Sequence, residues 1–112
     1  MTTTMQRTQA VGDLAWAGQH EQAIAAATAA LARKSLRADD RMTLLDLRSE
    51  SHLALGDLER ADDDAQAMKA LARQQGGAAL QVRALCRESE VQTRRSNPRR
   101  GVTSATAASK AA

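Results

Sequence analysis

Five carboxylates lie within eight positions of the sequence, at Asp57, Glu59, Asp62, Asp63 and Asp64. Such a group would hold a divalent cation or supply acid/base catalysis if its side chains converged. Consecutive helical residues point about 100° apart, so the three adjacent aspartates cannot meet at one ion. The spacing does not match a calcium-binding loop either. We therefore predict a solvated helix face, with Asp57 as the N-cap of the helix.

Other residues with reactive side chains are few. His20 and His52 are the only histidines, and no serine has a histidine and an acid arranged as a catalytic triad. Cys86 has no second cysteine with which to form a disulfide or a metal site, so we expect it to be half-buried and inert. No glycine-rich phosphate loop is present. We predict no catalytic residues, no cofactor and no metal, and interpret the protein as a non-enzyme.

The composition favours helices. Of 112 residues 43% are hydrophobic, alanine dominates, Trp16 is the only aromatic residue and Pro98 the only proline. Alanine has the best intrinsic helix propensity, and runs of β-branched residues bounded by turns are missing. We therefore predict a single all-α domain over residues 1–112, with a core of alanine- and leucine-sized side chains.

No targeting or membrane segment is recognisable in the sequence. The first 18 residues lack the apolar stretch of a secretory signal, and no apolar run is long enough to span a bilayer. A lone cysteine suits a reducing compartment. We therefore expect a cytoplasmic protein that does not bind membranes.

A pattern of small residues occurs twice, 38 positions apart, and begins at Gly18 and Gly56. The matched residues are Ala23, Ala27 and Ala30 in the first copy and Ala61, Ala65 and Met68 in the second. The glycine permits the tight turn that ends one helix, and the small residues let the next helix pack closely. A fainter copy follows 40 positions later, with Ser96 in place of the glycine and Gly101, Ala105 and Ala108 at the small positions.

The pattern predicts three antiparallel helix pairs, in repeats of about 3–37, 38–75 and 76–111. The six helices are expected at about 3–17, 19–33, 39–55, 57–74, 77–95 and 98–110. Asp39 or Asp40 is expected to cap the third helix, and Gly76 and Gly77 to end the fourth. Asn97 and Pro98 suit the start of the sixth helix.

Through these positions the chain resembles the tetratricopeptide repeat (TPR) family, a helix–turn–helix of about 34 residues. The second copy fits best, with Ser49 and Gly56 at the small first-helix position and the turn. The family's large aromatics are missing: tyrosine positions hold Leu14, His52, His20 and Leu58. The resemblance implies a right-handed solenoid of stacked helix hairpins, of the divergent, longer kind found in large bacterial signalling and regulatory proteins.

The resemblance also implies a concave groove that binds a peptide or helix and is lined by the first helix of each pair. The groove positions would include Met5, Trp16, Thr43, Asp46, Glu50, Leu53, Arg83, Cys86, Glu90 and Arg94. Trp16 has an alternative role in packing between the helices of the first pair. The lysines and asparagines that clamp a peptide carboxylate in this family are absent from the matching positions, so we expect a protein ligand of mixed charge.

Charge is unevenly distributed along the chain, whose net charge is +3. Residues 1–75 hold nine basic and eleven acidic residues, a net charge of −2, whereas residues 76–112 hold seven and two, a net charge of +5. The basic third makes weak nucleic-acid binding an alternative function, although it lacks aromatics for base stacking. A homo-oligomer formed through the alanine-rich faces is a second alternative.

No capping helix follows the third repeat, so we expect this chain to be part of a larger protein, or else to cover its last face with another copy. We predict a protein–protein interaction scaffold, within a larger signalling protein, whose partner is a protein or peptide. Nucleic acid is not the expected partner.

Overall fold

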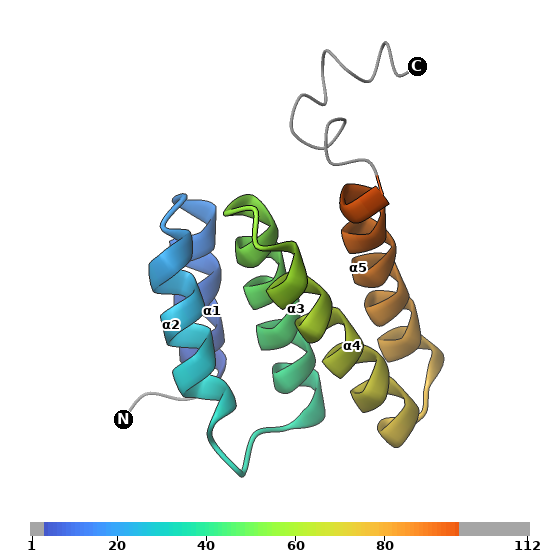
Figure 1. Cartoon of the computed structure of the whole chain (residues 1–112). Helices are drawn as coiled ribbons and strands as arrows, with labels where there is room; N and C mark the ends of the chain where they lie inside the picture. The colour runs from blue at the N-terminus through green and yellow to red at the C-terminus, as the bar shows by residue number, and fades with distance from the viewer. Residues whose placement is uncertain (1–3, 97–112) are drawn as a thin grey trace.

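The computed structural model of the protein describes residues 4–96, which form five α-helices and no strand (Figure 1). They are α1 (Thr4–Trp16), α2 (His20–Leu31), α3 (Ala38–Ala54), α4 (Leu58–Gln75) and α5 (Ala78–Ser96). The all-α prediction is confirmed, and each of the first five predicted helices corresponds to one observed helix. The predicted helix over 98–110 lies outside the described residues.

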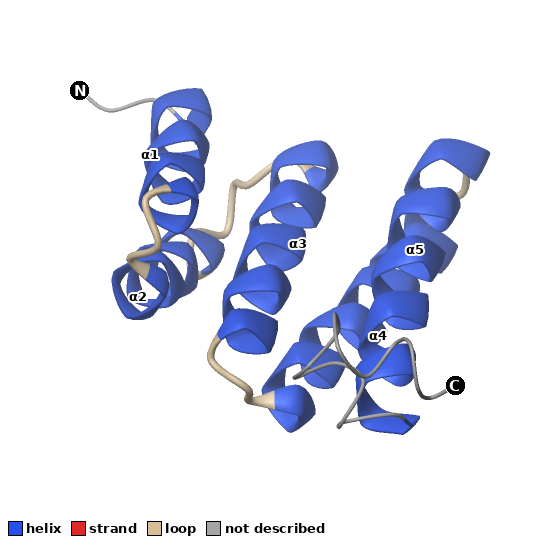
Figure 2. Cartoon of the chain, turned by 90° about the horizontal axis from the view of Figure 1, so that it is seen from above, coloured by secondary structure: helices blue, strands red, loops and turns tan. Residues whose placement is uncertain are grey.

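The helices form two layers (Figure 2). α1, α3 and α5 lie in one layer, and α2 and α4 lie in the other. The central helix α3 contacts all four of the others, whereas the backbones of α2 and α4, both fully described, lie farther apart. Each of the other four helices is therefore positioned by direct contact with α3.

The glycine turns after α1 and α3 have the same backbone structure. Gly18 and Gly56 both adopt φ +81°. In each turn the glycine N–H donates to the carbonyl three residues earlier, and the following N–H donates to the carbonyl five residues earlier. This is the Schellman arrangement, which satisfies the free carbonyls at a helix C-terminus. The 38-residue repeat in sequence is thus a repeat in hydrogen bonding.

Helix ends match the predicted caps in part. Asp57 caps α4 as predicted, because its Oδ1 accepts a hydrogen bond at 3.2 Å from the N–H three residues later. Gly76 ends α4 with φ +77°. The predicted cap of α3 is wrong: the helix follows Arg37, which makes no side-chain cap, and Asp39 and Asp40 lie in its first turn. Their carboxylates there interact favourably with the helix dipole.

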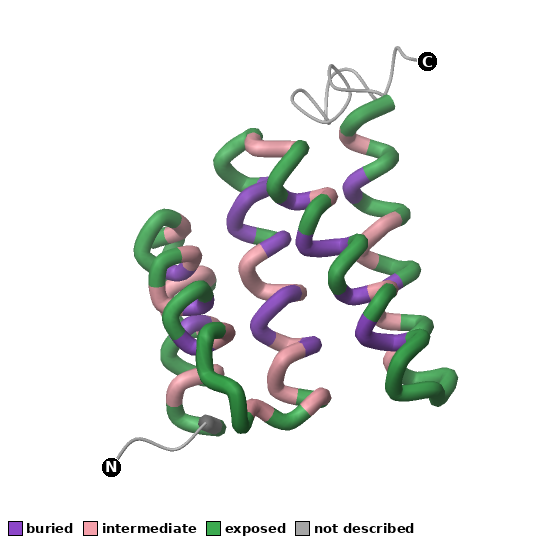
Figure 3. Tube along the Cα trace, turned by 60° about the horizontal axis from the view of Figure 1, so that its bottom comes forward, coloured by how far each residue is buried: buried purple, intermediate pink, exposed green. Residues whose placement is uncertain are grey.

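The matched residues of the repeat belong to the core. All six are at most 4% exposed: Ala23, Ala27 and Ala30 in α2, and Ala61, Ala65 and Met68 in α4. In Figure 3 the buried positions lie along the facing sides of the helices. Buried Ser49 satisfies its hydroxyl by donating to the Ala61 carbonyl at 2.9 Å. The alanines of α2 and α4 therefore pack together with larger apolar side chains of α3, such as Met42 and Leu44.

The large apolar side chains that stay exposed within residues 4–96 belong to the end helices and to one turn. They are Met5 and Trp16 of α1, Leu55 in the turn before α4, and Val82 and Leu85 of α5. None of the described helices combines the length and apolar character that crossing a membrane requires. Exposed apolar surface is thus concentrated on α1 and α5.

We expect Gly56→Ala to lower the free energy of unfolding by about 1–2 kcal/mol, because a Cβ disfavours positive φ. The matched control is Gly12→Ala within α1. A Cβ at Gly12 would meet Leu47 Cδ1 at an ordinary 3.9 Å, and alanine favours helix. This control should raise the free energy of unfolding by about 0.5–1 kcal/mol. Urea unfolding followed by circular dichroism measures both; effects of the same sign would contradict the analysis.

Candidate functional site

The candidate site is the surface formed by α1, α3 and α5, which we call the odd-helix face. These three helices form one layer of the molecule (Figure 2). All ten residues of the predicted groove lie on them. They are Met5 and Trp16 on α1, Thr43, Asp46, Glu50 and Leu53 on α3, and Arg83, Cys86, Glu90 and Arg94 on α5.

Arg87 of α5 forms the centre of a charged cluster on the odd-helix face. Its Nε donates to Oδ1 of Asp46 on α3 at 2.8 Å, and its Nη1 donates to Oε1 of Glu90 at 2.9 Å. Its Nη2 lies 3.9 Å from Oε1 of Glu50. The Arg87 side chain is only 11% exposed. One guanidinium thus holds three carboxylates from two helices.

The surroundings of Arg87 keep it charged. Burial alone would lower the pKa of Arg87, but the hydrogen bond to Asp46 and the negative charges of Asp46, Glu90 and Glu50 outweigh burial and raise it above its ordinary value. A permanently charged guanidinium cannot serve as an acid or base near neutral pH. Its role here is to join α3 to α5 and to fix the positions of the carboxylates.

Further contacts bring most of the predicted residues together. Arg83 Nη2 donates to Thr43 Oγ1 at 3.1 Å, again between α5 and α3, and Arg94 Nη2 lies 3.6 Å from Glu90 Oε2. Sequence reasoning missed Arg87. It lies four residues after Arg83 and three before Glu90, so helical spacing places it on the same face.

Leu53 does not belong to the odd-helix face. It is 4% exposed and packs with Ala61, Ala65 and Val91 between α3, α4 and α5. Its prediction as a groove residue is corrected, because α5 covers this turn of α3. Cys86 also differs from expectation, since it is exposed on α5 rather than half-buried.

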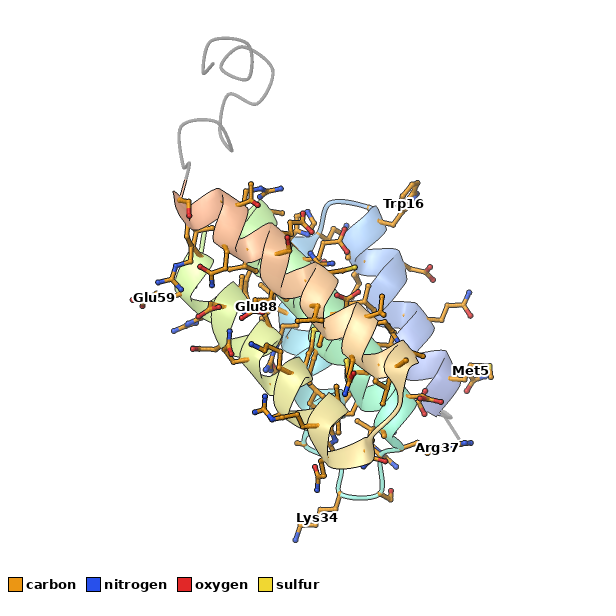
Figure 4. The ribbon with its side chains drawn as sticks, turned by 90° about the vertical axis from the view of Figure 1, so that its right-hand side faces the viewer. Met5, Trp16, Lys34, Arg37, Glu59 and Glu88 are labelled. Atoms are coloured by element: carbon orange, nitrogen blue, oxygen red, sulfur yellow. The ribbon has the colours of Figure 1, made fainter. Side chains whose placement is uncertain are left out.

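Trp16 is the most exposed large apolar side chain in the described part, at 93%. The alternative in which it packs between α1 and α2 is therefore wrong. Met5, 75% exposed, lies about three helical turns before it. Figure 4 shows both side chains pointing away from the bundle on the same side, opposite Glu59 of α4. They are two separate exposed apolar side chains, at opposite ends of α1.

A second polar cluster joins α2, α3 and α4. Arg48 donates from Nη2 to Asp64 Oδ1 at 2.7 Å and from Nε to Asp64 Oδ2 at 3.0 Å, while its Nη1 donates to Thr28 Oγ1 at 2.9 Å. The Asp64 side chain is 5% exposed. The prediction of a wholly solvated acidic run is therefore wrong at Asp64. The signal was present, because Asp64 lies three residues after Ala61 and four before Met68, on the buried stripe.

His52 lies beside this cluster, with Nε2 3.9 Å from Asp64 Oδ2. Burial lowers the pKa of His52 below its ordinary value; Asp64 and Asp57 act in the opposite direction, and Arg48 and Arg60 add to the lowering. His20 contacts α3, with Nδ1 3.0 Å from Ser51 Oγ. Both histidines thus have contacts within the helix packing.

A hollow of about 270 Å³ opens between α2 and α4, and Arg48, His52 and Asp64 form part of its lining. No set of three or more His, Cys, Asp or Glu side chains within residues 4–96 is placed to hold a metal ion. The carboxylate of Asp64 is already occupied by Arg48, so it is not free to act as a base. The cluster ties helices together, and the odd-helix face remains the better candidate for a site.

Comparison of the chain with models of protein families, with curated proteins and with solved structures finds no match.

We expect Asp64→Asn to lower the free energy of unfolding by about 2–3 kcal/mol, because it leaves the Arg48 guanidinium without its carboxylate. The control is Asp63→Asn, an exposed neighbour in the same run, which should change it by less than about 0.5 kcal/mol. Urea unfolding measures the difference. Equal effects of the two variants would show that Asp64 is not a structural partner.

The free energy of unfolding should fall as pH is lowered through 6.5, the ordinary pKa of histidine. Just below this pH the unfolded chain binds a proton at His52, whereas the folded chain, in which the pKa of His52 is lowered, does not. The free energy of unfolding therefore changes by at most about 1.4 kcal/mol per pH unit. His52→Leu, which copies the equivalent Leu14 of the first repeat, should reduce this dependence. Urea unfolding of the wild type and of His52→Leu at about pH 7.5 and about pH 5.5 measures this dependence. The same change in the free energy of unfolding with pH in both proteins would contradict the prediction.

Proposed function

We propose that the protein is a non-enzymatic protein-interaction module that binds a peptide or a helix along the odd-helix face. The observation that carries this proposal is the exposure of Trp16 and Met5 at one edge of a face whose centre holds charged groups from α3 and α5. Exposed tryptophan is a frequent anchor of protein interfaces, and a surrounding polar rim supplies specificity.

We also propose that the helix pairs stack as a right-handed, TPR-like solenoid of six helices, the last over 98–110. The identical turns at Gly18 and Gly56 support this, as do the contacts of α3 with α1 and α5 in one layer. A regular step between pairs would curve the layer and make the odd-helix face the concave one.

The ligand we propose carries an apolar side chain for Trp16 and charges of both signs. Glu50 and Glu90 keep about half of their side-chain surface exposed, at 56% and 46%, while Arg87 is almost covered. Carboxylates are therefore more accessible than guanidinium at the centre of the face, which suits a basic group on the ligand. Arg94, 36% exposed, would take an acidic one.

A protein partner fits these charges better than nucleic acid does. Arg87 is neutralised by Asp46, and Arg95 lies 3.0 Å from Asp62. Arginines already paired with carboxylates contribute little to phosphate binding. On the resemblance to the TPR family alone, we propose that the chain is the interaction segment of a larger cytoplasmic signalling or regulatory protein of bacterial type.

The test is selection of binders from a displayed random-peptide library on the wild-type protein. Peptides enriched on the wild type should bind Trp16→Ala and Glu50→Lys at least about tenfold more weakly, because a buried aromatic anchor or a reversed central charge costs 1.4 kcal/mol or more. Fluorescence anisotropy of labelled selected peptides measures the affinities.

The matched control is Glu59→Lys, which makes the same charge change at an exposed position of α4 on the opposite side (Figure 4). It should leave peptide affinity within about twofold, since exposed charges at a distance are screened. Peptides that lose affinity with Glu59→Lys but not with the other two variants would place binding elsewhere. A library that yields no peptide specific for the wild type would reject the proposal.

A further inference from the structure

α5 carries an apolar stripe that no described helix covers. Val82 and Leu85, one turn apart, are 58% and 54% exposed, and Ser89 follows one turn later, also exposed. We call these three residues the open stripe. The residues through which α5 packs on α4, among them Ala84 and Val91, are buried and lie on a different face of the helix.

The open stripe has a covered counterpart on α3. Forty positions earlier stand Met42, Leu45 and Ser49, which are 0%, 6% and 0% exposed. Met42 and Leu45 share a core cluster with residues of α4, and the Ser49 hydroxyl donates to a carbonyl of α4. The same pattern of side chains is thus buried by the next helix in one pair and uncovered in the other.

The residues of α4 that cover this pattern recur in the sequence with the same displacement. Ala61, Ala65, Met68 and Leu71 correspond, 40 positions on, to Gly101, Ala105, Ala108 and Ala111. Asp57, which caps α4, corresponds to Asn97, another good capping residue. The same displacement of 40 residues therefore relates α3 to α5 and the covering residues of α4 to those of the segment 98–111.

Resting on the six-helix arrangement proposed above, we propose that the open stripe of α5 is the docking face for residues 98–111 of the same chain, bound as α4 is bound to α3. In that register Ser89 donates to the carbonyl of residue 101, as Ser49 donates to that of residue 61. Alanines replace Met68 and Leu71, so this contact buries less apolar surface and is weaker than that between α3 and α4. The solvent-exposed stripe is the acceptor of a weakly held helix.

A second copy of the chain fits the stripe less well. A two-fold contact would place Val82 and Leu85 against the same two residues of the other copy, whereas α4 covers α3 through a row that begins with the small residues Ala61 and Ala65. Such a row follows α5 directly in its own sequence, where the connection makes docking intramolecular and hence favourable at any protein concentration. The experiment must therefore distinguish docking within one chain from association of two copies.

The experiment is amide hydrogen exchange on the full chain. Residues 102–111 should exchange at least about tenfold more slowly than in a free peptide of the same sequence, and Leu85→Glu should remove that protection while residues 20–75 stay protected. Exchange of residues 102–111 at the free-peptide rate in the wild type would overturn the proposal. So would protection that rises with protein concentration, because that indicates a second copy.

A gain of protection provides a test that misfolding cannot imitate. Ala108→Met copies Met68 of α4 and should slow exchange in residues 102–111 a further tenfold or so by adding buried apolar surface. Ala107→Met is the matched control, because its counterpart Ala67 is exposed in α4. Equal protection in the two variants would reject the register, and with it the proposal.

Discussion

The close approach of helices through alanine-sized side chains is the constraint on which this structure depends. α2 and α4 present Ala23, Ala27, Ala61 and Ala65 to their neighbours, each fully buried. Small side chains allow short distances between helix axes but remove little apolar area from water, at about 25 cal/mol per Å². Such a core determines how close the helices lie, but it determines less firmly how far each helix is shifted along its neighbour. Other contacts must fix this shift, which we call the register.

Ion pairs and charged hydrogen bonds between helices supply that register. Arg48 links α3 to Asp64 of α4 and Thr28 of α2, and Arg87 links α5 to Asp46 of α3. Buried or half-buried pairs of this kind add little net stability, since desolvation offsets their attraction, but a misplaced helix would leave a charge unpaired. Within the described residues no buried side-chain nitrogen or oxygen lacks a partner. The polar contacts therefore select one arrangement among many that an alanine surface would permit.

The helices, their turns and the small-residue core could be predicted from the sequence, because glycine turns and alanine spacing act locally. The contacts between side chains could not. Leu53 was expected on a surface and is buried, whereas Trp16 is exposed. Both outcomes depend on which neighbour covers a given turn of helix, and a difference of one residue rotates a side chain by about 100°. Asp64 was missed because a charged residue on an apolar stripe looks like a break in the pattern until its partner, Arg48 of α3, is known. Arg87 lies on a charged face of its helix, and its partner Asp46 on α3 could not be identified from the sequence.

The two well-described helix pairs differ in a way that follows from their positions. Where the pair of α3 and α4 has Arg48, Ser49 and Asp64, the pair of α1 and α2 has Ala10, Val11 and Ala26, 38 positions earlier. α3 and α4 each have described helices packed on both sides. A shift of either helix along its axis would therefore disrupt two interfaces at once. α1 contacts only α2 and α3, so apolar residues suffice at its interface. The polar residues are thus concentrated where register matters most. The outer side of α1 takes no part in this internal packing, which leaves Met5 and Trp16 free for contact with another molecule.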